Sequence, residues 1–416
     1  MSHSRSTERY HALDALRATA LLLGLVLHAG LSFCFPKDAW PGHDWSQSTT
    51  LDIVLFVIHG FRMQVFFLLA GFFARKLYQA QSVLAFAHDR IHRIALPLLA
   101  GWLIVGTLTR LAWNWGMLAP GTALEATIDG YLSGAALPGG AAFSLYHFWF
   151  LYYLLLFYVA ALAAQSLLER FDASGDLRIQ AVIIFRTLVQ HPLGMLPLAI
   201  PLALSIYLCK SIYFGIDTPR FSLIPEWPAL LGYAPFFFFG WMLERLPGLL
   251  EVWRNRWPAY LIAGLSSICA LYAIAREHSL TTSVASLGGE GAAYSIGYGI
   301  SMLLLVAGVT GLFLCQMNFH SPRVRYLADS SYWIYIMHLP LLLFMQVWLG
   351  DLHWHWTVKF PLYILASTTV LLVSYHYLVR STFIGEFLNG RRRPLPAQAQ
   401  PNRTAASSLS PVTLSN

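Results

Sequence analysis

Ten apolar segments, most of them about 20 residues long, constrain the fold of this chain more than any other feature. A helix needs about 20 apolar residues to cross the hydrocarbon core of a bilayer. Only 11% of the residues are charged, against about 25% in a typical soluble protein. The pattern therefore predicts an all-α, polytopic integral membrane helix bundle with about ten transmembrane helices. The segments lie near residues 13–34, 50–74, 91–112, 146–168, 192–210, 229–243, 258–275, 294–316, 329–349 and 358–379.

Lysine and arginine are unevenly distributed between the loops that join these segments. If the N-terminus is cytoplasmic, 20 of the 27 Lys and Arg residues fall in cytoplasmic segments and 6 in outer segments, while Arg62 lies inside an apolar segment. Cytoplasmic loops of membrane proteins carry such an excess of positive charge. The distribution predicts an even number of spans with both termini in the cytoplasm. It also accounts for the net charge of +7 without a nucleic-acid partner.

The composition changes near the C-terminal end of the chain. Residues 1–390 form one predicted membrane domain, because no long hydrophilic insertion interrupts the apolar segments. Residues 391–416 begin with three arginines and continue with Pro, Ala, Ser and Gln, which is typical of disorder. We therefore predict a cytoplasmic tail that is basic at first and then disordered.

The first apolar segment contains three ionisable residues, which are costly inside a bilayer. Arg17 and His28 are eleven residues apart, so on a helix they return to within about 20° of the same face. Asp14 lies about 40° away on the other side of His28. The rise from Arg17 to His28 is about 16 Å, comparable to a slender thioester-bearing arm. The spacing predicts one polar stripe from the inner mouth to the outer half of this helix.

The second apolar segment holds His59 and Arg62 near its middle. Such an arginine either forms a structural ion pair or offers a cation to an anionic acyl group or a developing oxyanion. His28 is either a packing residue or a general base, since imidazole has an unperturbed pKa of about 6.5. His338 in the ninth segment has the same two interpretations. Our candidate catalytic residues are His28, Arg62 and Asp14.

The predicted cytoplasmic start of the third segment carries Arg90 and Arg93, which share a helix face. Their charge either serves topology alone or, together with Arg17, binds the phosphates of a nucleotide-bearing donor. The four cysteines have no metal-type spacing, and we predict no metal site.

The predicted outer face is rich in tryptophan, which is typical of an interfacial aromatic belt. Aromatic rings also stack on sugars, and hydrogen-bonding side chains lie at the same level, so a glycan acceptor is the alternative occupant of this face. The candidate substrate-binding residues are His59, His147, Trp149, Arg220, Glu226, Trp227 and His338.

Several motifs, spread in order over residues 9–385, resemble those of membrane-bound acyltransferase family 3. They are Leu13-Asp14-Ala15-Leu16-Arg17-Ala18 followed by His28, Phe66-Phe67-Leu68-Leu69-Ala70-Gly71-Phe72, Arg90-x-x-Arg93, His147-Phe148-Trp149-Phe150-Leu151 and Tyr332-Trp333-Ile334-Tyr335-Ile336-Met337-His338. The resemblance implies an acyl-CoA-dependent O-acyltransferase, with His28 as the essential histidine and Arg90 and Arg93 as the coenzyme A site. Many members carry Ser where this chain has Ala70, so an acyl-serine intermediate at that position is impossible here.

Within the family, the stretch Phe61-Arg62-Met63-Gln64-Val65-Phe66-Phe67 is similar to that of members that succinylate osmoregulated periplasmic glucans. This resemblance implies transfer of a succinyl group from cytoplasmic succinyl-CoA, a donor substrate and not a permanently bound cofactor, to hydroxyls of a periplasmic glucan. It also implies a multi-pass protein of the bacterial inner membrane, and other glucan-synthesis proteins are further expected partners.

Two alternative functions remain open at this point. The first is an O-acetyltransferase that acts on lipopolysaccharide or another envelope polysaccharide. A cation within the membrane favours succinyl over acetyl, because only succinyl carries a free carboxylate. The second is a proton-coupled transporter, which would also place His and Arg in the membrane; the chain shows no clear internal repeat of the kind common in transporters.

Overall fold

The structure is a computed structural model that describes residues 11–36, 39–118, 121–133, 143–172, 174–190, 194–319 and 321–389. Within these residues every regular element is helical, as expected. The predicted tail, residues 391–416, lies outside the described residues. The α-helices are α1 (His11–Gly30), α2 (Thr49–His59), α3 (Arg62–Ala80), α4 (Val83–Arg90), α5 (Leu96–Met117), α6 (Leu124–Leu132), α7 (Trp149–Phe171), α8 (Asp176–Gln190), α9 (Ala199–Tyr207), α10 (Trp227–Leu243), α11 (Pro247–Ala275), α12 (Gly288–Gln316), α13 (Pro322–Gly350), α14 (Trp356–Ser374) and α15 (Phe383–Asn389).

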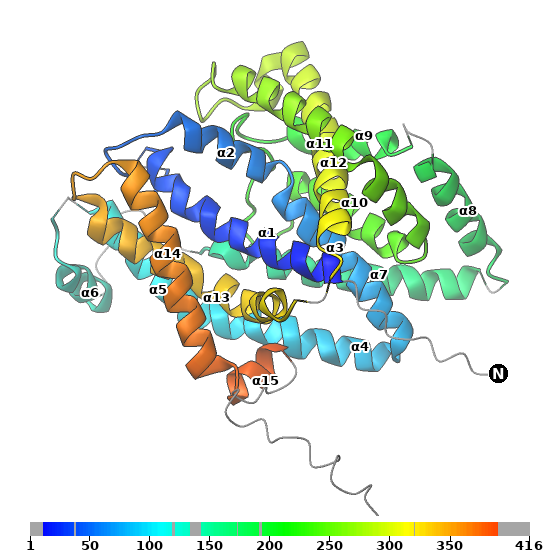
Figure 1. The fold of residues 1–416 in the computed structure, drawn as a ribbon, viewed down its shortest axis with the longest axis horizontal. Helices are drawn as coiled ribbons and strands as arrows, with labels where there is room; N and C mark the ends of the chain where they lie inside the picture. The colour runs from blue at the N-terminus through cyan, green and yellow to red at the C-terminus, as the bar shows by residue number, and fades with distance from the viewer. Residues whose placement is uncertain are drawn as a thin grey trace, which may run out of the picture.

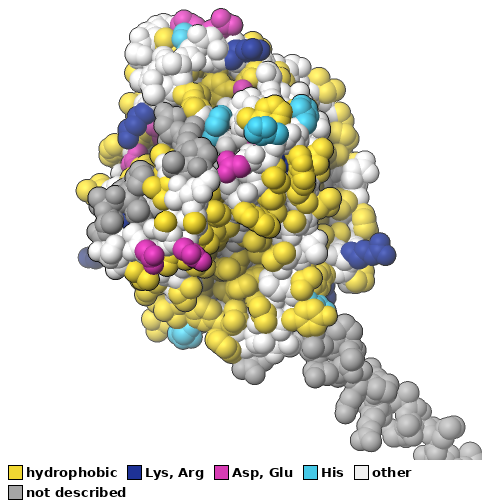
Figure 2. Space-filling view, turned by 90° about the vertical axis from the view of Figure 1, so that its left-hand side faces the viewer, with side chains coloured by type: hydrophobic (Ala, Val, Ile, Leu, Met, Phe, Trp, Pro, Cys, Tyr) yellow, Lys and Arg dark blue, Asp and Glu magenta, His cyan; other side chains and the backbone are white. Residues whose placement is uncertain are grey.

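The membrane-bundle prediction is confirmed. Among the described residues, eight helical segments are long and apolar enough to cross a membrane, and two shorter apolar helices, Leu196–Tyr207 and Trp227–Leu243, coincide with the predicted segments 192–210 and 229–243. Hydrophobic side chains cover most of the face in Figure 2, and charged side chains are sparse on it. Such a surface suits the hydrocarbon of a bilayer.

Helix α1 crosses the centre of the bundle (Figure 1), so its polar residues lie among the other helices. On one side α1 packs against α13 and α14, and α13 also packs against α5. On the other side α1 contacts α3 and α12, while α10 packs on α3 and α12 packs on α9 and α11. The site described below lies where these two groups of helices meet around α1.

The second predicted segment, 50–74, is not one continuous helix. It breaks at Gly60, where α2 ends with His59, and α3 begins with Arg62. The intervening Phe61 has φ −140° and ψ −23°, which is not helical. Arg62 still lies inside the apolar span Thr49–Ala80, as expected, but it opens a helix of 19 residues within that span. The N-terminus of a helix has unpaired N–H groups and a partial positive charge, so the break adds to the positive potential around Arg62.

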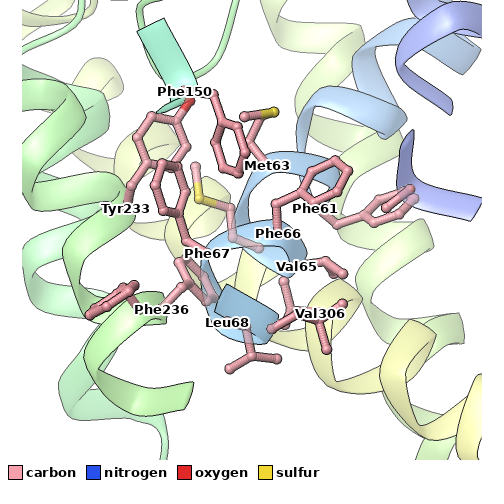
Figure 3. Packing of buried hydrophobic residues seen from close by; sticks show 14 of the residues in the cluster. Phe61, Met63, Val65, Phe66, Phe67, Leu68, Phe150, Tyr233, Phe236 and Val306 are labelled. Carbon is pink, nitrogen blue, oxygen red and sulfur yellow. The ribbon is translucent and has the colours of Figure 1, made fainter. Parts of the chain in front are cut away.

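The start of α3 is fixed by aromatic packing against two other helices, α7 and α10 (Figure 3). The Phe67 ring stacks on Tyr233 of α10 with centroids 4.9 Å apart and meets Phe150 of α7 edge-on at 5.0 Å. Val65 and Phe67 are fully buried. Aromatic contacts of this kind add specific geometry to burial, and they orient Arg62 at the end of the same helix.

The crossing of α3 and α10 requires glycine on both helices. A Cβ on Gly71 would lie 1.9 Å from the carbonyl oxygen of Phe237, and a Cβ on Gly240 would lie 2.0 Å from that of Leu68. Backbone cannot move aside as a flexible side chain can. We expect Gly71→Ala to destabilise the folded protein by about 1–3 kcal/mol or more, the usual cost of overpacking, measured as a lower Tm in detergent.

Gly106→Ala is the matched control, because the nearest atom to its added Cβ lies at 3.6 Å, an ordinary contact. Equal melting temperatures for the two variants would contradict the proposed close crossing.

Candidate functional site

A cavity of about 450 Å³ lies beside α1, and its exposed lining residues Lys210 and Phe221 place its mouth at the segment that joins α9 to α10. Helices α1, α3, α5, α7, α10 and α13 contribute to its wall, together with the last turn of α2. Most of the predicted catalytic and substrate-binding residues line it. They are His28, His59, Arg62, His147, Trp149, Arg220, Glu226 and His338.

Arg62 lies directly against α1, one turn from His28. A Cβ on Gly24 would come within 2.5 Å of Arg62 Nη1, so the guanidinium occupies the space that a side chain would fill. Gly24 and His28 are four residues apart on α1 and therefore share a face. Both Gly24 and His28 line the cavity with Arg62. Because residue 24 is a glycine, the predicted cation Arg62 can lie beside the predicted base His28.

Backbone carbonyls fix the tautomers of three histidines in the cavity wall. His338 Nδ1 is 2.7 Å from the Tyr335 carbonyl oxygen, and His147 Nε2 is 3.1 Å from that of Ile336. His59 Nδ1 is 3.1 Å from the carbonyl oxygen of Leu55. A carbonyl only accepts, so each of these nitrogens carries the hydrogen in the neutral ring, and the other nitrogen keeps its lone pair. These three rings can each accept one further hydrogen bond.

His28 is held between an aromatic ring and a second imidazole. Its ring stacks on Trp40 with centroids 5.7 Å apart, and His338 lies 5.2 Å away. Gln346 fixes this arrangement, because its amide donates to the His28 carbonyl oxygen at 2.8 Å and accepts from Trp40 Nε1 at 2.9 Å. His28 Nδ1 has no hydrogen-bond partner among the described residues. His28 thus carries a buried, unsatisfied imidazole nitrogen in the wall of the cavity.

Three further residues, Trp40, Gln346 and Tyr335, belong to the site, although the sequence alone does not predict them as site residues. Trp40 and Tyr335 line the cavity, and Gln346 holds Trp40 against His28. A signal for Gln346 did exist, because an amide within an apolar segment needs internal partners. Trp40 gave no such signal, since one interfacial tryptophan looks like any other in sequence.

Charge is divided between the depth and the mouth of the cavity. The deep part carries Arg62 and the four histidines, and the only carboxylates in the described lining are Asp217 and Glu226, in the segment between α9 and α10. No ion pair is found for Arg62 in the described part of the chain. Buried charges are normally paired, so an unpaired cation beside a cavity suits an anionic ligand.

The mouth is polar and partly buried. Burial raises the pKa of the Asp217 carboxyl above its usual range, while the backbone N–H of Lys210, which donates to it at 2.8 Å, opposes this shift. Burial lowers the pKa of the Arg220 guanidinium, which lies over the Trp113 ring at 5.2 Å. Cationic and aromatic groups at this depth can hold a polar, ring-shaped ligand.

Asp14 and Arg17 do not extend the predicted polar stripe from His28 along the cavity. They form an ion pair with each other at 3.3 Å, and the Arg17 guanidinium lies 5.7 Å from the centroid of the Phe73 ring. Neither residue belongs to the described cavity lining. The helix arithmetic placed the three residues near one face, but the cavity follows only the outer half of that face.

Arg90 and Arg93 both form ion pairs with one carboxylate. Asp89 pairs with both of them, the contact to Arg93 being 2.9 Å, and Arg90 also donates to the Tyr158 hydroxyl at 3.4 Å. The Arg93 side chain remains 43% exposed, against 17% for Arg90. Arg90 and Arg93 thus lie on one face of the helix, and Arg93 is the more exposed to solvent.

Two stacked tyrosines lie between this cluster and the cavity. Tyr335 lines the cavity, and its ring stacks on Tyr332 with centroids 6.2 Å apart and an interplanar angle of 15°. The Tyr332 hydroxyl donates to the Arg93 carbonyl oxygen at 2.9 Å. The arginine cluster itself, residues 89–93, does not line the cavity. Trp227 does not line it either and is 69% exposed.

Comparison with known protein families matches residues 10–376 to a family described as an acyltransferase domain. Curated relatives from Salmonella paratyphi B, Salmonella dublin and Salmonella enteritidis, each named glucans biosynthesis protein C, are 25% identical over 353 residues. These matches cover 82% of this chain and 84% of each relative. No solved structure matches the chain. Because the family match spans nearly the whole helix bundle, the chain belongs to acyltransferase family 3 and is a multi-pass membrane acyltransferase.

Proposed function

We propose that this protein transfers a succinyl group from cytoplasmic succinyl-CoA to hydroxyls of a periplasmic glucan. One observation carries the proposal: His28 and Arg62 face one cavity, and among the described residues Arg62 has no ion-pair partner and the deep part of the lining holds imidazoles and no carboxylate. The break before α3 adds a helix N-terminus, which also favours anions. Relatives named glucans biosynthesis protein C support a glucan as acceptor. The reaction places the protein in the bacterial inner membrane.

The proposed chemistry uses the two central groups in turn. His28 takes the proton of a glucan hydroxyl while the hydroxyl oxygen attacks the thioester carbon. The carbonyl oxygen becomes an oxyanion, which Arg62 stabilises, or Arg62 and His59 hold the free carboxylate of the succinyl group. The carbon–sulfur bond then breaks, and the protonated His28 returns its proton to the departing thiolate of coenzyme A. The products are a glucan succinyl ester and free coenzyme A.

The donor and the acceptor approach from opposite ends of this route. Arg93, with Arg90 and Arg17, binds the phosphates of succinyl-CoA at the inner surface, and Asp14 holds Arg17 through their ion pair. The glucan enters at the mouth of the cavity. At the mouth it contacts Arg220, Glu226 and the exposed Trp227 at the start of α10, and deeper in the cavity it reaches His147, Trp149 and His338.

We expect Arg93→Gln to raise the KM for succinyl-CoA about tenfold with little change in kcat, because a charge-assisted contact to phosphate is lost. Arg254→Gln is the matched control. Arg254 is similarly exposed, at 45%, and also pairs with an acid on its own helix, Glu251 at 3.3 Å. An unchanged donor KM in Arg93→Gln would indicate that this residue serves topology alone.

The proposed function is tested by reconstitution. The purified protein is placed in liposomes with labelled succinyl-CoA and a β-glucan, and mass spectrometry of the glucan detects succinyl esters. The same assay with acetyl-CoA separates the succinyl proposal from acetyl transfer. Acetylated glucan without succinylated glucan would overturn the donor assignment, and transfer to other envelope polysaccharides alone would overturn the acceptor.

A further inference from the structure

A second cavity, of about 320 Å³, lies beside the first and has no part in the reaction described above. Its wall comes from the segment after α1, the end of α5 and the end of α13. A volume near 300 Å³ is within the range of small-ligand sites. Its described lining includes Trp115, Gln346, Trp348 and Asp351.

Three chain segments run directly from the first cavity into the second. Trp40 lines the first cavity, and its neighbour Pro41 lines the second. On α5, Trp113 lines the first cavity and Trp115 the second. On α13, His338 and Gln346 are eight residues apart, about 12 Å along the helix, so the two cavities are close neighbours.

The partition between the cavities is tightly packed and is tied to the reaction site. A Cβ on Gly42 would lie 2.7 Å from Gln346 Cβ, and a Cβ on Gly116 would lie 2.8 Å from Pro41. Gln346 lines the second cavity and also bonds the His28 carbonyl oxygen and Trp40. Gln346 therefore fixes the distance between the second cavity and His28.

The lining of the second cavity has the chemistry of a sugar site. Trp348 is 71% exposed and offers an apolar ring, and the indole of Trp115 is fixed by its bond to the Thr122 carbonyl oxygen at 2.8 Å. The exposed Asp351 has no ion-pair partner in the described part of the chain. A carboxylate accepts hydrogen bonds from hydroxyl groups, and an aromatic ring covers the apolar face of a pyranose.

We propose that this cavity is a second glycan subsite, which holds a sugar residue of the same acceptor chain that presents its hydroxyl to His28. This inference rests on the proposed function and deepens it, since it assigns a preference for long acceptors. Trp348 stacks on the remote sugar, and Asp351 accepts hydrogen bonds from its hydroxyls.

The test compares a long β-glucan with a glucose disaccharide as acceptor, using the reconstituted full chain. We expect Trp348→Ala and Asp351→Asn each to raise the KM for the long glucan about tenfold and to leave the KM for the disaccharide unchanged. Trp354→Ala is the control for a purely interfacial tryptophan, because Trp354 is 48% exposed and does not line the cavity. Its KM for both acceptors should match the wild-type value.

Equilibrium binding of the long glucan in nanodiscs, without donor, separates the two proposals. If wild type transfers succinyl groups but both variants keep the wild-type KM and affinity, the subsite is wrong and the proposed function stands. If wild type transfers nothing but binds the glucan, and both variants bind it about tenfold more weakly, the subsite stands and the proposed function is wrong. Equal losses in Trp354→Ala would also overturn the subsite, and a wild type that does not bind glucan would overturn both.

Discussion

Membranes that carry His28→Ala should transfer labelled succinate to glucan about 10²–10⁴-fold more slowly than wild type, the usual contribution of a general base. His28 lines the cavity with an unpaired Nδ1, and Gln346 and Trp40 hold its backbone and ring in place. Loss of the imidazole removes the group that takes the hydroxyl proton. The measurement is the initial rate of succinyl ester formation at saturating donor and acceptor.

His28→Gln provides the second variant, because its amide retains polar bulk beside Trp40 but cannot take up a proton. Both variants should keep the wild-type Tm and the wild-type affinity for succinyl-CoA, which shows that the fold survives. A wild-type rate in a folded His28→Ala protein would rule out His28 as the base. His338, 5.2 Å away with an unpaired Nε2, would then be the next residue to test.

Arg62→Leu should slow succinyl transfer about 10²–10³-fold, in line with the loss of one oxyanion donor. If Arg62 holds the succinyl carboxylate, acetyl transfer should fall much less, because acetyl has no such group. The measurement is the ratio of the two rates in the same liposomes, so that differences in protein yield cancel. Equal losses of succinyl and acetyl transfer would show that Arg62 stabilises the oxyanion and does not hold the succinyl carboxylate. If neither rate falls, Arg62 has neither role.

Gly24→Ala tests the same contact from the opposite helix. Its Cβ would lie 2.5 Å from Arg62 Nη1, so the guanidinium must move while its charge is kept. We expect a smaller rate loss than in Arg62→Leu and a similar ratio between succinyl and acetyl transfer. Gly106→Ala, which adds a methyl group in ordinary contact, serves again as the control.

Much of the fold could be predicted from the sequence because each span must satisfy its own backbone inside the bilayer. Apolar length alone therefore located the helices, including the short Leu196–Tyr207 and Trp227–Leu243. The break at Gly60 escaped prediction, since the segment 50–74 is apolar enough on both sides of His59 and Arg62 to be taken as one helix, whereas Phe61 leaves the helical conformation. Helix α8 escaped as well, because it is amphipathic and too short to span.

Site residues could be predicted where their position follows from the periodicity of one helix. They could not be predicted where their position depends on packing between helices. His28 and Arg62 attract notice because ionisable groups in lipid are costly, and the structure brings them together. Periodicity placed Arg17 close to the same face as His28, yet Arg17 turns to Asp14 and Phe73. Nothing in a single helix reveals where a cavity stops, because that depends on neighbours distant in sequence, here Tyr332 and Tyr335.

The stacked Tyr332 and Tyr335 have a consequence for the energetics of the cell. A permanently open passage through an energised membrane would leak protons and dissipate the potential, worth about 2.3 kcal/mol per charge at 100 mV. The two stacked rings lie between the arginine cluster and the cavity, where they would close such a passage at rest. In the proposed reaction, a pantetheine arm that displaced them would fill the opening it created, so that acyl groups would cross while ions would not.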